Sequence, residues 1–277
     1  MSELVCHPET ITLIQQLADN LPHAVLLYGS KGVGLQYISR EIAGKSLVNI
    51  VRPTDRDGNI MNDGSGEIRI PQIRELIMQT RGKSTTRRVV IVDDADKMNL
   101  PAQQAFLKLL EEPTDNTHFI LTAHNTQALL PTIRSRVQTH VIKPISQQQS
   151  GELIYTHGVS DTRRIQQLLF LAEGRPAELT HLLIDEVYFT TQVAAVEDAR
   201  TLLQGSLADR TRVAQKYQSD RIGALRMLEQ AVRIVQVTLK RKPSITLITS
   251  VEQLTRTHQR IANNANVRLQ LLNFVVQ

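Results

Sequence analysis

Apolar and polar positions follow two different periods in the first half of the chain. Short continuous apolar runs, which are typical of strands buried in a parallel sheet, alternate with stretches in which apolar residues recur at helical spacing. Because strands that alternate with helices form βαβ units, this half predicts an α/β domain with a parallel sheet. The predicted strands are 24–28, 46–52, 89–92, 118–123 and 139–142, and the predicted helices are 10–20, 35–45, 71–81, 101–112 and 129–135.

The pattern changes after Lys143-Pro144, and nearly all of 146–277 has helical periodicity. Prolines at Pro176 and Pro243 interrupt it, and no internal repeat is present. We therefore predict three domains. They are an α/β domain at 1–145, a small helical domain at 146–186 and a larger helical domain at 187–277.

Composition narrows the functional classes only slightly. The net charge of +5 and the pI of about 9.5 permit contact with nucleic acid without requiring it. A single cysteine excludes an intrachain disulfide and a cysteine zinc site, and the eight histidines lack metal-ligand spacing, so we expect no bound metal. The first residues lack the apolar core of a signal peptide, and no apolar run approaches ~18 residues. We expect a soluble, cytoplasmic protein.

A glycine-rich loop follows the first predicted strand. Gly29 and Gly34 fit the two glycine positions of the phosphate-binding pattern G-x-x-x-x-G-K-[ST], with Gly32 between them. Leu35 occupies the lysine position and Gln36 the Ser/Thr position. Leucine has no charge for the phosphates and glutamine has no hydroxyl for a metal ion. The loop therefore predicts a nucleotide-type cradle that binds nucleotide weakly at most.

Two acids follow the apolar strand 89–92. An aspartate at the carboxyl end of such a strand can hold magnesium beside bound phosphates, and Asp93 has that position. Asp94 stands where a glutamate often polarises the attacking water, although its side chain is one methylene shorter. A solvated acidic turn would give the same pattern. The glycine loop some 60 residues upstream favours the nucleotide-domain interpretation.

Four stretches of the first domain resemble the AAA+ module of bacterial DNA polymerase III clamp-loader subunits. They are 70–76, the acidic strand with its Ala-Asp-Lys-Met extension at 95–98, the helix 102–113 that ends in LLEEP, and the Ile-Arg-Ser-Arg run at 133–136. The resemblance covers about 8–145. It implies an AAA+ P-loop domain with a parallel sheet and flanking helices, followed by a small helical lid and an all-α collar. The last helix, near 266–277, also resembles that of the family.

The resemblance implies a role for Ser135 and Arg136. In the family this Ser-Arg pair presents an arginine finger to ATP held by the neighbouring subunit, and the matching arginine here is Arg136. A guanidinium offers a charged fork that stabilises charge on a transferred phosphoryl group. The alternative is that Arg136 caps the short helix before it or pairs with an acid.

Departures from the family pattern resemble those of its non-hydrolysing subunit. Besides Leu35 and Gln36, the four-cysteine module is missing, the first sensor position falls near Ala123-His124, and the second falls at Ala177, with Arg175 out of register. Gly29, Gly32, Gly34, Asp93 and Asp94 would then form a vestigial nucleotide site.

The resemblance also predicts the ligands and partners of such a subunit. No cofactor would be bound tightly, while ATP and magnesium would lie at a neighbour's site. The implied partners are gamma/tau-like motor and delta-like subunits, the sliding clamp and primer–template DNA, with no membrane.

Two other functions remain open from the residues. The chain would be an active AAA+ ATPase if another group replaced the loop lysine. It would be a stand-alone DNA-binding protein if its basic residues contacted DNA without partners. Arg81, Lys83, Arg87 and Arg88 cluster near 82–86, where they predict either contact with the DNA backbone or a solvated loop.

Overall fold

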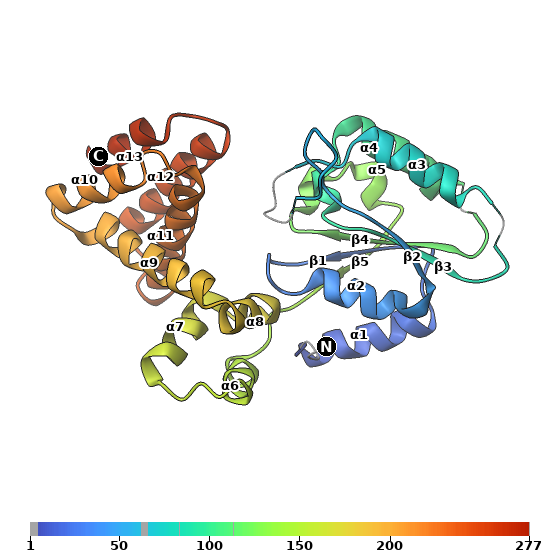
Figure 1. Ribbon diagram of the computed structural model, residues 1–277, viewed down its shortest axis with the longest axis horizontal. Helices are drawn as coiled ribbons and strands as arrows, with labels where there is room; N and C mark the ends of the chain where they lie inside the picture. Colours follow the sequence, from blue (N-terminus) through green and yellow to red (C-terminus); the bar gives the residue numbers. More distant parts are fainter. Residues whose placement is uncertain (1–4, 62–65, 83, 113, 277) are drawn as a thin grey trace. The chain divides into compact units, whose positions relative to one another are not determined.

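The computed structural model describes residues 5–61, 66–82, 84–112 and 114–276. The chain forms two compact units, Met1–Leu183 and Ile184–Gln277, which are drawn in Figure 1. The first unit contains the α/β part together with most of the helices predicted for the lid. The predicted boundary between those two parts stays a prediction. Pro113, predicted to end the helix 101–112, lies outside the described residues.

A five-stranded parallel sheet forms the centre of the first unit. Its strand order is β2-β3-β4-β1-β5, and every neighbouring pair is parallel. This confirms the predicted α/β class. The strands are β1 (Ala24–Tyr28), β2 (Leu47–Val51), β3 (Arg88–Val92), β4 (Thr117–Ala123) and β5 (Gln138–Val141).

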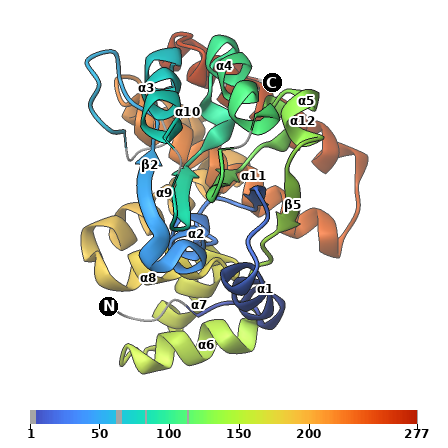
Figure 2. The same ribbon diagram turned by 90° about the vertical axis from the view of Figure 1, so that its right-hand side faces the viewer.

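Helices cover both faces of the sheet, because alternate residues of each buried strand point to opposite sides. Figures 1 and 2 show α1 (Pro8–Asp19) and α2 (Leu35–Ala43) on one face. The other face carries α3 (Ile70–Thr80), α4 (Leu100–Glu111) and α5 (Pro131–Arg134).

Two apolar cores result from this arrangement. In β1, Val25 and Leu27 belong to the core beneath α1 and α2, whereas Leu26 belongs to the core beneath α3 and α4. In the second core the rings of Phe106 and Phe119 meet edge to face at 5.5 Å. Both faces of the central strands are therefore buried, which explains their continuous apolar sequence.

Three chain segments meet at the carboxyl edge of the sheet. The glycine loop follows β1, Asp93 follows β3 and His124 follows β4. In open parallel sheets, ligands bind outside this edge. The topology therefore gathers the residues that the sequence marked as a nucleotide site.

Three helices complete the first unit: α6 (Gln147–Thr156), α7 (Thr162–Ala172) and α8 (Pro176–Ile184). The turn before α8 contains Gly174, whose φ is +73°. A side chain there would collide with the carbonyl oxygen of Ile145. The amide of Ile145 also donates to the carbonyl of Gly174 at 2.8 Å, so this turn requires glycine.

The described residues of the second unit are all helical or in turns, as predicted. Buried residues of all five helices form one core, which includes Leu202, Ala214, Leu228, Leu254 and Leu271. No helix among the described residues is long and apolar enough to cross a membrane. The helices are α9 (Glu186–Gln204), α10 (Leu207–Lys216), α11 (Arg221–Arg241), α12 (Ile245–Ala262) and α13 (Val267–Val276).

Two residues of the basic cluster have structural partners. Arg87 Nη1 donates to the carbonyl of Ala18, in the last turn of α1, at 2.7 Å. Arg88 Nη2 donates to the carbonyls of Thr80 and Gly82, at 3.2 and 2.6 Å, and so caps the end of α3. Cations are favourable at helix C-termini. The solvated-loop alternative is therefore wrong for these two arginines. Lys83 lies outside the described residues.

Arg88→Ala is expected to lower the free energy of unfolding by about 1–3 kcal/mol, because it leaves partly buried carbonyls without their charged donor. Arg81→Ala, at an exposed position of the same cluster, is the control and should change stability by less than about 0.5 kcal/mol. Urea unfolding followed by circular dichroism measures both. Equal stability of the two variants would contradict the capping role.

Candidate functional site

The glycine loop has the backbone shape of a phosphate cradle. Gly32 and Gly34 have φ of +89° and +98°, a region that favours glycine. A side chain at Gly29 would come within 2.9 Å of the carbonyl oxygen of Ile142. Gly34 is the N-cap of α2, so the first amides of that helix have no partner within the helix. Such amides, with the helix dipole, attract anions.

The two substituted positions of the loop have different surroundings. Leu35 is 4% exposed and belongs to the core beneath α1 and α2. Gln36 remains at the site, where its Nε2 donates to Oδ2 of Asp93 at 2.6 Å. In a hydrolysing site, position 36 carries a Ser or Thr hydroxyl that binds the metal ion. Here the side-chain amide of Gln36 binds the carboxylate of Asp93 instead.

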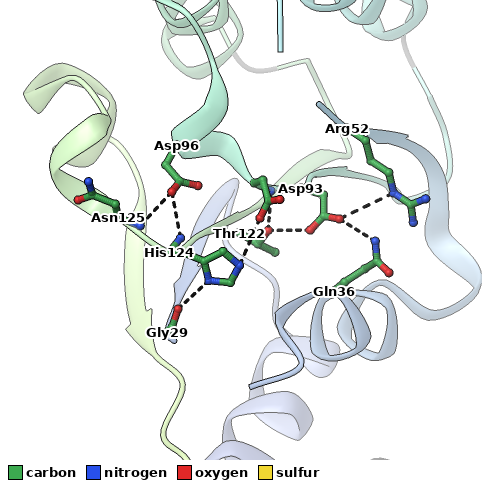
Figure 3. A network of polar contacts seen from close by, with 9 residues as sticks. Gly29, Gln36, Arg52, Asp93, Asp96, Thr122, His124 and Asn125 are labelled. Carbon is green, nitrogen blue, oxygen red and sulfur yellow. Dashed lines mark hydrogen bonds and ion pairs between the residues drawn. The ribbon is translucent and has the colours of Figure 1, made fainter. Parts of the chain in front are cut away.

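Asp93 is fully engaged by protein groups (Figure 3). Thr122 Oγ1 donates to its Oδ1 at 2.8 Å, and Arg52 Nε lies 3.8 Å from its Oδ2. Arg52 supplies the positive charge that magnesium would otherwise bring. The donor set therefore fits a metal ion poorly, because an ion would have to displace Gln36 and approach Arg52. The described residues also contain no group of three or more His, Cys, Asp or Glu side chains able to hold a metal.

Asp94 and His124 form a second polar pair. The Nδ1 of His124 lies 2.8 Å from the carbonyl oxygen of Gly29, which can only accept, so Nδ1 carries a hydrogen. Its Nε2 lies 3.4 Å from Oδ1 of Asp94. Burial, followed by the charge of Asp93, raises the pKa of Asp94 above its usual value, while His124 opposes the shift. His124 thus ties the glycine loop to the acidic strand end.

Asp96 fixes the start of the segment after β4. Its Oδ2 accepts from the backbone amides of His124 and Asn125 at 3.3 and 3.0 Å (Figure 3). The Asp in the Ala-Asp-Lys-Met stretch therefore has a definable structural task, which is to hold His124 in place.

These residues surround a pocket of about 450 Å³. The structure brings together Gly32, Gly34, Asp93 and Asp94, as predicted from the sequence, with the carbonyl of Gly29 nearby. Three polar residues of its lining, namely Arg52, Thr122 and His181, were not predicted from the sequence. Arg52 and Thr122 lie at the carboxyl ends of β2 and β4. Asp93 was identified by its position at the corresponding end of β3, so the same criterion would have found both residues. No comparable signal marked His181, on α8.

Ser135 and Arg136 lie just after α5 and do not line this pocket. Arg136 Nη2 contacts Oε1 of Glu111 at 3.0 Å, and its Nη1 donates to the carbonyl of Thr132 at 3.1 Å. Ser135 Oγ donates to the same carbonyl at 3.1 Å. The Arg136 side chain is still 39% exposed. Both alternatives to the finger are present in the isolated chain, because Arg136 caps a carbonyl of α5 and pairs with an acid, and the guanidinium also remains accessible from outside.

A protein-family profile described as DNA polymerase III, delta subunit, matches residues 7–146. The chain belongs to this clamp-loader family of AAA+ proteins. It is 29% identical over 208 residues to the DNA polymerase III subunit delta' of Pseudomonas aeruginosa, covering 67% of this chain and 63% of that one. It is also 29% identical over 154 residues to replication factor C subunit 3 of Saccharomyces cerevisiae, covering 53% and 44%. Each match thus spans less than two thirds of the relative's length.

Solved structures support the same fold. The crystal structure of a DNA polymerase III gamma subunit-related protein from Thermotoga maritima matches with a TM-score of 0.50 at 20% identity, over 96% of this chain and 97% of that one. A RuvB variant from the same organism matches with a TM-score of 0.50 at 12% identity, over 84% and 78%. The clamp-loader family and its AAA+ fold, both expected from the sequence, are confirmed.

Asp94→Asn is expected to raise the thermal midpoint at pH 7 by roughly 1–2 °C, a small effect because the carboxylate is partly solvated. The raised pKa means that folding disfavours the ionised form. This penalty is fully present above the raised pKa and disappears below the ordinary value of 3.8, where the group is protonated in both states. Asparagine also tolerates the φ of +52° at this position.

Thermal unfolding at pH 7 and near pH 3 measures the difference. Asp115→Asn, at an exposed position, is the matched control and should show no gain at either pH. A variant at position 94 that is less stable than the wild type at pH 7 would show that the ionised carboxylate stabilises the site through His124.

Proposed function

We propose that this chain is a non-hydrolysing, delta-prime-like subunit of a bacterial replicative clamp loader. In this role it gives Arg136 to the ATP site of a neighbouring subunit while the sliding clamp is loaded on primed DNA. The observation that carries the proposal is the contact of 2.6 Å between Gln36 Nε2 and Asp93 Oδ2. It occupies, from within the chain, an oxygen of the carboxylate that a hydrolysing site uses for its metal.

Several groups needed for hydrolysis are absent together at this site. The loop offers no lysine at position 35 and no hydroxyl at position 36, and Asp93 is already paired with Arg52. Loss of one charged phosphate contact costs about 1.5–3 kcal/mol, or roughly tenfold to a hundredfold in affinity. These observations support a chain that holds no tightly bound cofactor, with ATP and magnesium at a neighbour's site instead.

The backbone of the loop supports residual anion binding. The first amides of α2 lack helical partners, and the left-handed glycines keep the cradle open. Hydrolysis needs more than this, because the charge that develops on the phosphoryl group needs a metal and a cation beside it. The contacts of Asp93 therefore give no support to an active ATPase.

The position of Arg136 supports action on another subunit. Arg136 lies outside the chain's own pocket, follows the short helix α5 and remains partly exposed. Its guanidinium has the geometry needed to bind phosphate oxygens with two hydrogen bonds. We propose gamma/tau-like motor subunits and a delta-like subunit as neighbours in the assembled loader, with the sliding clamp and primer–template DNA as further partners.

Calorimetric titration with ATP and magnesium tests the first half of this proposal. The purified chain should give no detectable heat of binding up to millimolar ATP, because lysine and metal contacts are missing. A motor subunit of the loader titrated under the same conditions is the positive control. Binding in the micromolar range would overturn the non-hydrolysing role and would make Asp93→Asn the next variant.

Arg136→Ala in the assembled loader tests the second half. Hydrolysis at the one site that Arg136 serves should fall by about 10³-fold or more, with matching loss of clamp loading, because arginine fingers contribute this much to phosphoryl transfer. Single-turnover ATP hydrolysis and clamp loading are the measurements. Arg74→Ala, an exposed arginine on α3, is the control. Unchanged turnover in the Arg136 variant, with assembly intact, would contradict the finger.

A further inference from the structure

We propose that Arg175 and the first turn of α8 fasten the helices α6–α8 to the phosphate-binding loop, so that the chain's own contacts, rather than a bound nucleotide, hold these helices in place. This inference deepens the proposed function. The inference rests on the proposed function for one premise, that the site works without nucleotide. Arg136 has no role in the inference.

Arg175 makes three hydrogen bonds from one guanidinium. Its Nε and Nη2 donate to the carbonyls of Ala172 and Leu171, at 2.9 and 2.6 Å, and so cap the end of α7. Its Nη1 donates to the carbonyl of Lys31, in the glycine loop, at 3.0 Å. Because the fork of arginine is planar and rigid, a guanidinium held at two points by α7 presents its third donor in a defined direction. The end of α7 and the loop are thereby joined.

A backbone contact from α8 adds a second link. The amide of Glu178 donates to the carbonyl of Gly32 at 3.0 Å. This amide lies in the first turn of α8, where it has no partner in its own helix. A side chain at Gly32 would come within 2.8 Å of Cβ of Glu178, so the backbones approach too closely for any residue but glycine. Gly32 thus serves the lid contact as well as the loop shape.

A third link lies where the sheet leads into α6. The amide of Ile145 donates to the carbonyl of Gly174, directly before Arg175. The segment between β5 and α6 would have to move with the helices. It is hydrogen-bonded to the turn that contains Gly174 and Arg175. Two hydrogen bonds, one from Arg175 and one from Glu178, would have to break for the helices to leave the loop, while the bond of Ile145 holds the start of α6 against the turn before α8.

The direction of these bonds shows that the attachment uses carbonyl oxygens of the loop and not the amides that would bind a phosphate. Lys31 and Gly32 accept through their carbonyl oxygens, which a phosphate cannot use as partners. On the pocket side, α8 presents the methyl group of Ala177, with His181 one turn further along the helix. A methyl group gives a phosphate no charge to bind, so a ligand in the pocket gains no hold on α8 at that position. The attachment and the vestigial cradle are thus separate features of one loop.

Hydrogen–deuterium exchange of the full chain tests the attachment. In the wild type, peptides that carry the amides of Ile145 and Glu178 should exchange at the same rate with and without millimolar ATP and magnesium. Arg175→Ala should speed their exchange by about tenfold or more, since three carbonyls, two of them in part-buried hydrogen bonds, lose a charged donor. Arg163→Ala, an exposed arginine on α7, is the matched control and should leave the rates unchanged.

Two results would overturn the proposal. One is exchange at Glu178 and Ile145 in the Arg175→Ala variant that equals that of the Arg163→Ala control. The other is exchange in the wild type that slows on addition of ATP and magnesium, which would show that nucleotide holds the helices. If Arg175→Ala fails to fold, Arg175→Lys replaces it. Lysine keeps the charge but lacks the fork, so exchange should still rise at the same two amides.

The outcome is separable from that of the proposed function. The comparison of Arg175→Ala with Arg163→Ala is made without nucleotide and without other subunits. It therefore stands even if Arg136→Ala leaves hydrolysis in the loader unchanged. Conversely, equal exchange in the Arg175→Ala and Arg163→Ala variants would remove the attachment without any bearing on the arginine finger.

Discussion

The pairing of Gln36 with Asp93 is the interaction on which the rest of the site depends. A carboxylate at the end of a buried strand needs compensation, because removing an unpaired charge from water is costly. A hydrolysing site meets that need with a metal ion held beside the phosphates. This chain meets it with the amide of Gln36, the hydroxyl of Thr122 and the guanidinium of Arg52. The charge of Asp93 is therefore compensated by groups of the chain itself.

Much of the fold follows from short-range patterns. The buried strands β1, β3 and β4 are apolar on both faces and were predicted to within about a residue. Helix ends were less accurate because capping decides them. For example, α1 begins at Pro8, a proline favoured in the first turn and capped by His7, rather than at Thr10. The helix predicted over 129–135 is only Pro131–Arg134, since a proline sets its first residue and Ser135 ends it.

The candidate site was predictable only in part, for a related reason. Glycines and acids that follow strands carry a local signature, so Gly34 and Asp93 were found from the sequence. The partners of Asp93 are distant in the chain, and Arg52 has no local pattern of its own. Likewise, the sequence left Arg136 free to pair with an acid but did not identify Glu111, because that contact depends on how α4 and α5 pack. Register and packing, rather than composition, decide which charges meet.

The burial of Leu35 has a consequence for any attempt to restore a catalytic loop by substitution. Its side chain is part of the core beneath α1 and α2, and Gln36 beside it satisfies Asp93. Lysine at position 35 would lose the apolar contacts of Leu35, and threonine at position 36 would remove the amide that donates to Oδ2 of Asp93. Each single step back lowers stability without restoring hydrolysis. The packing of Leu35 and the pairing of Asp93 therefore each oppose the restoration of a catalytic loop by a single substitution.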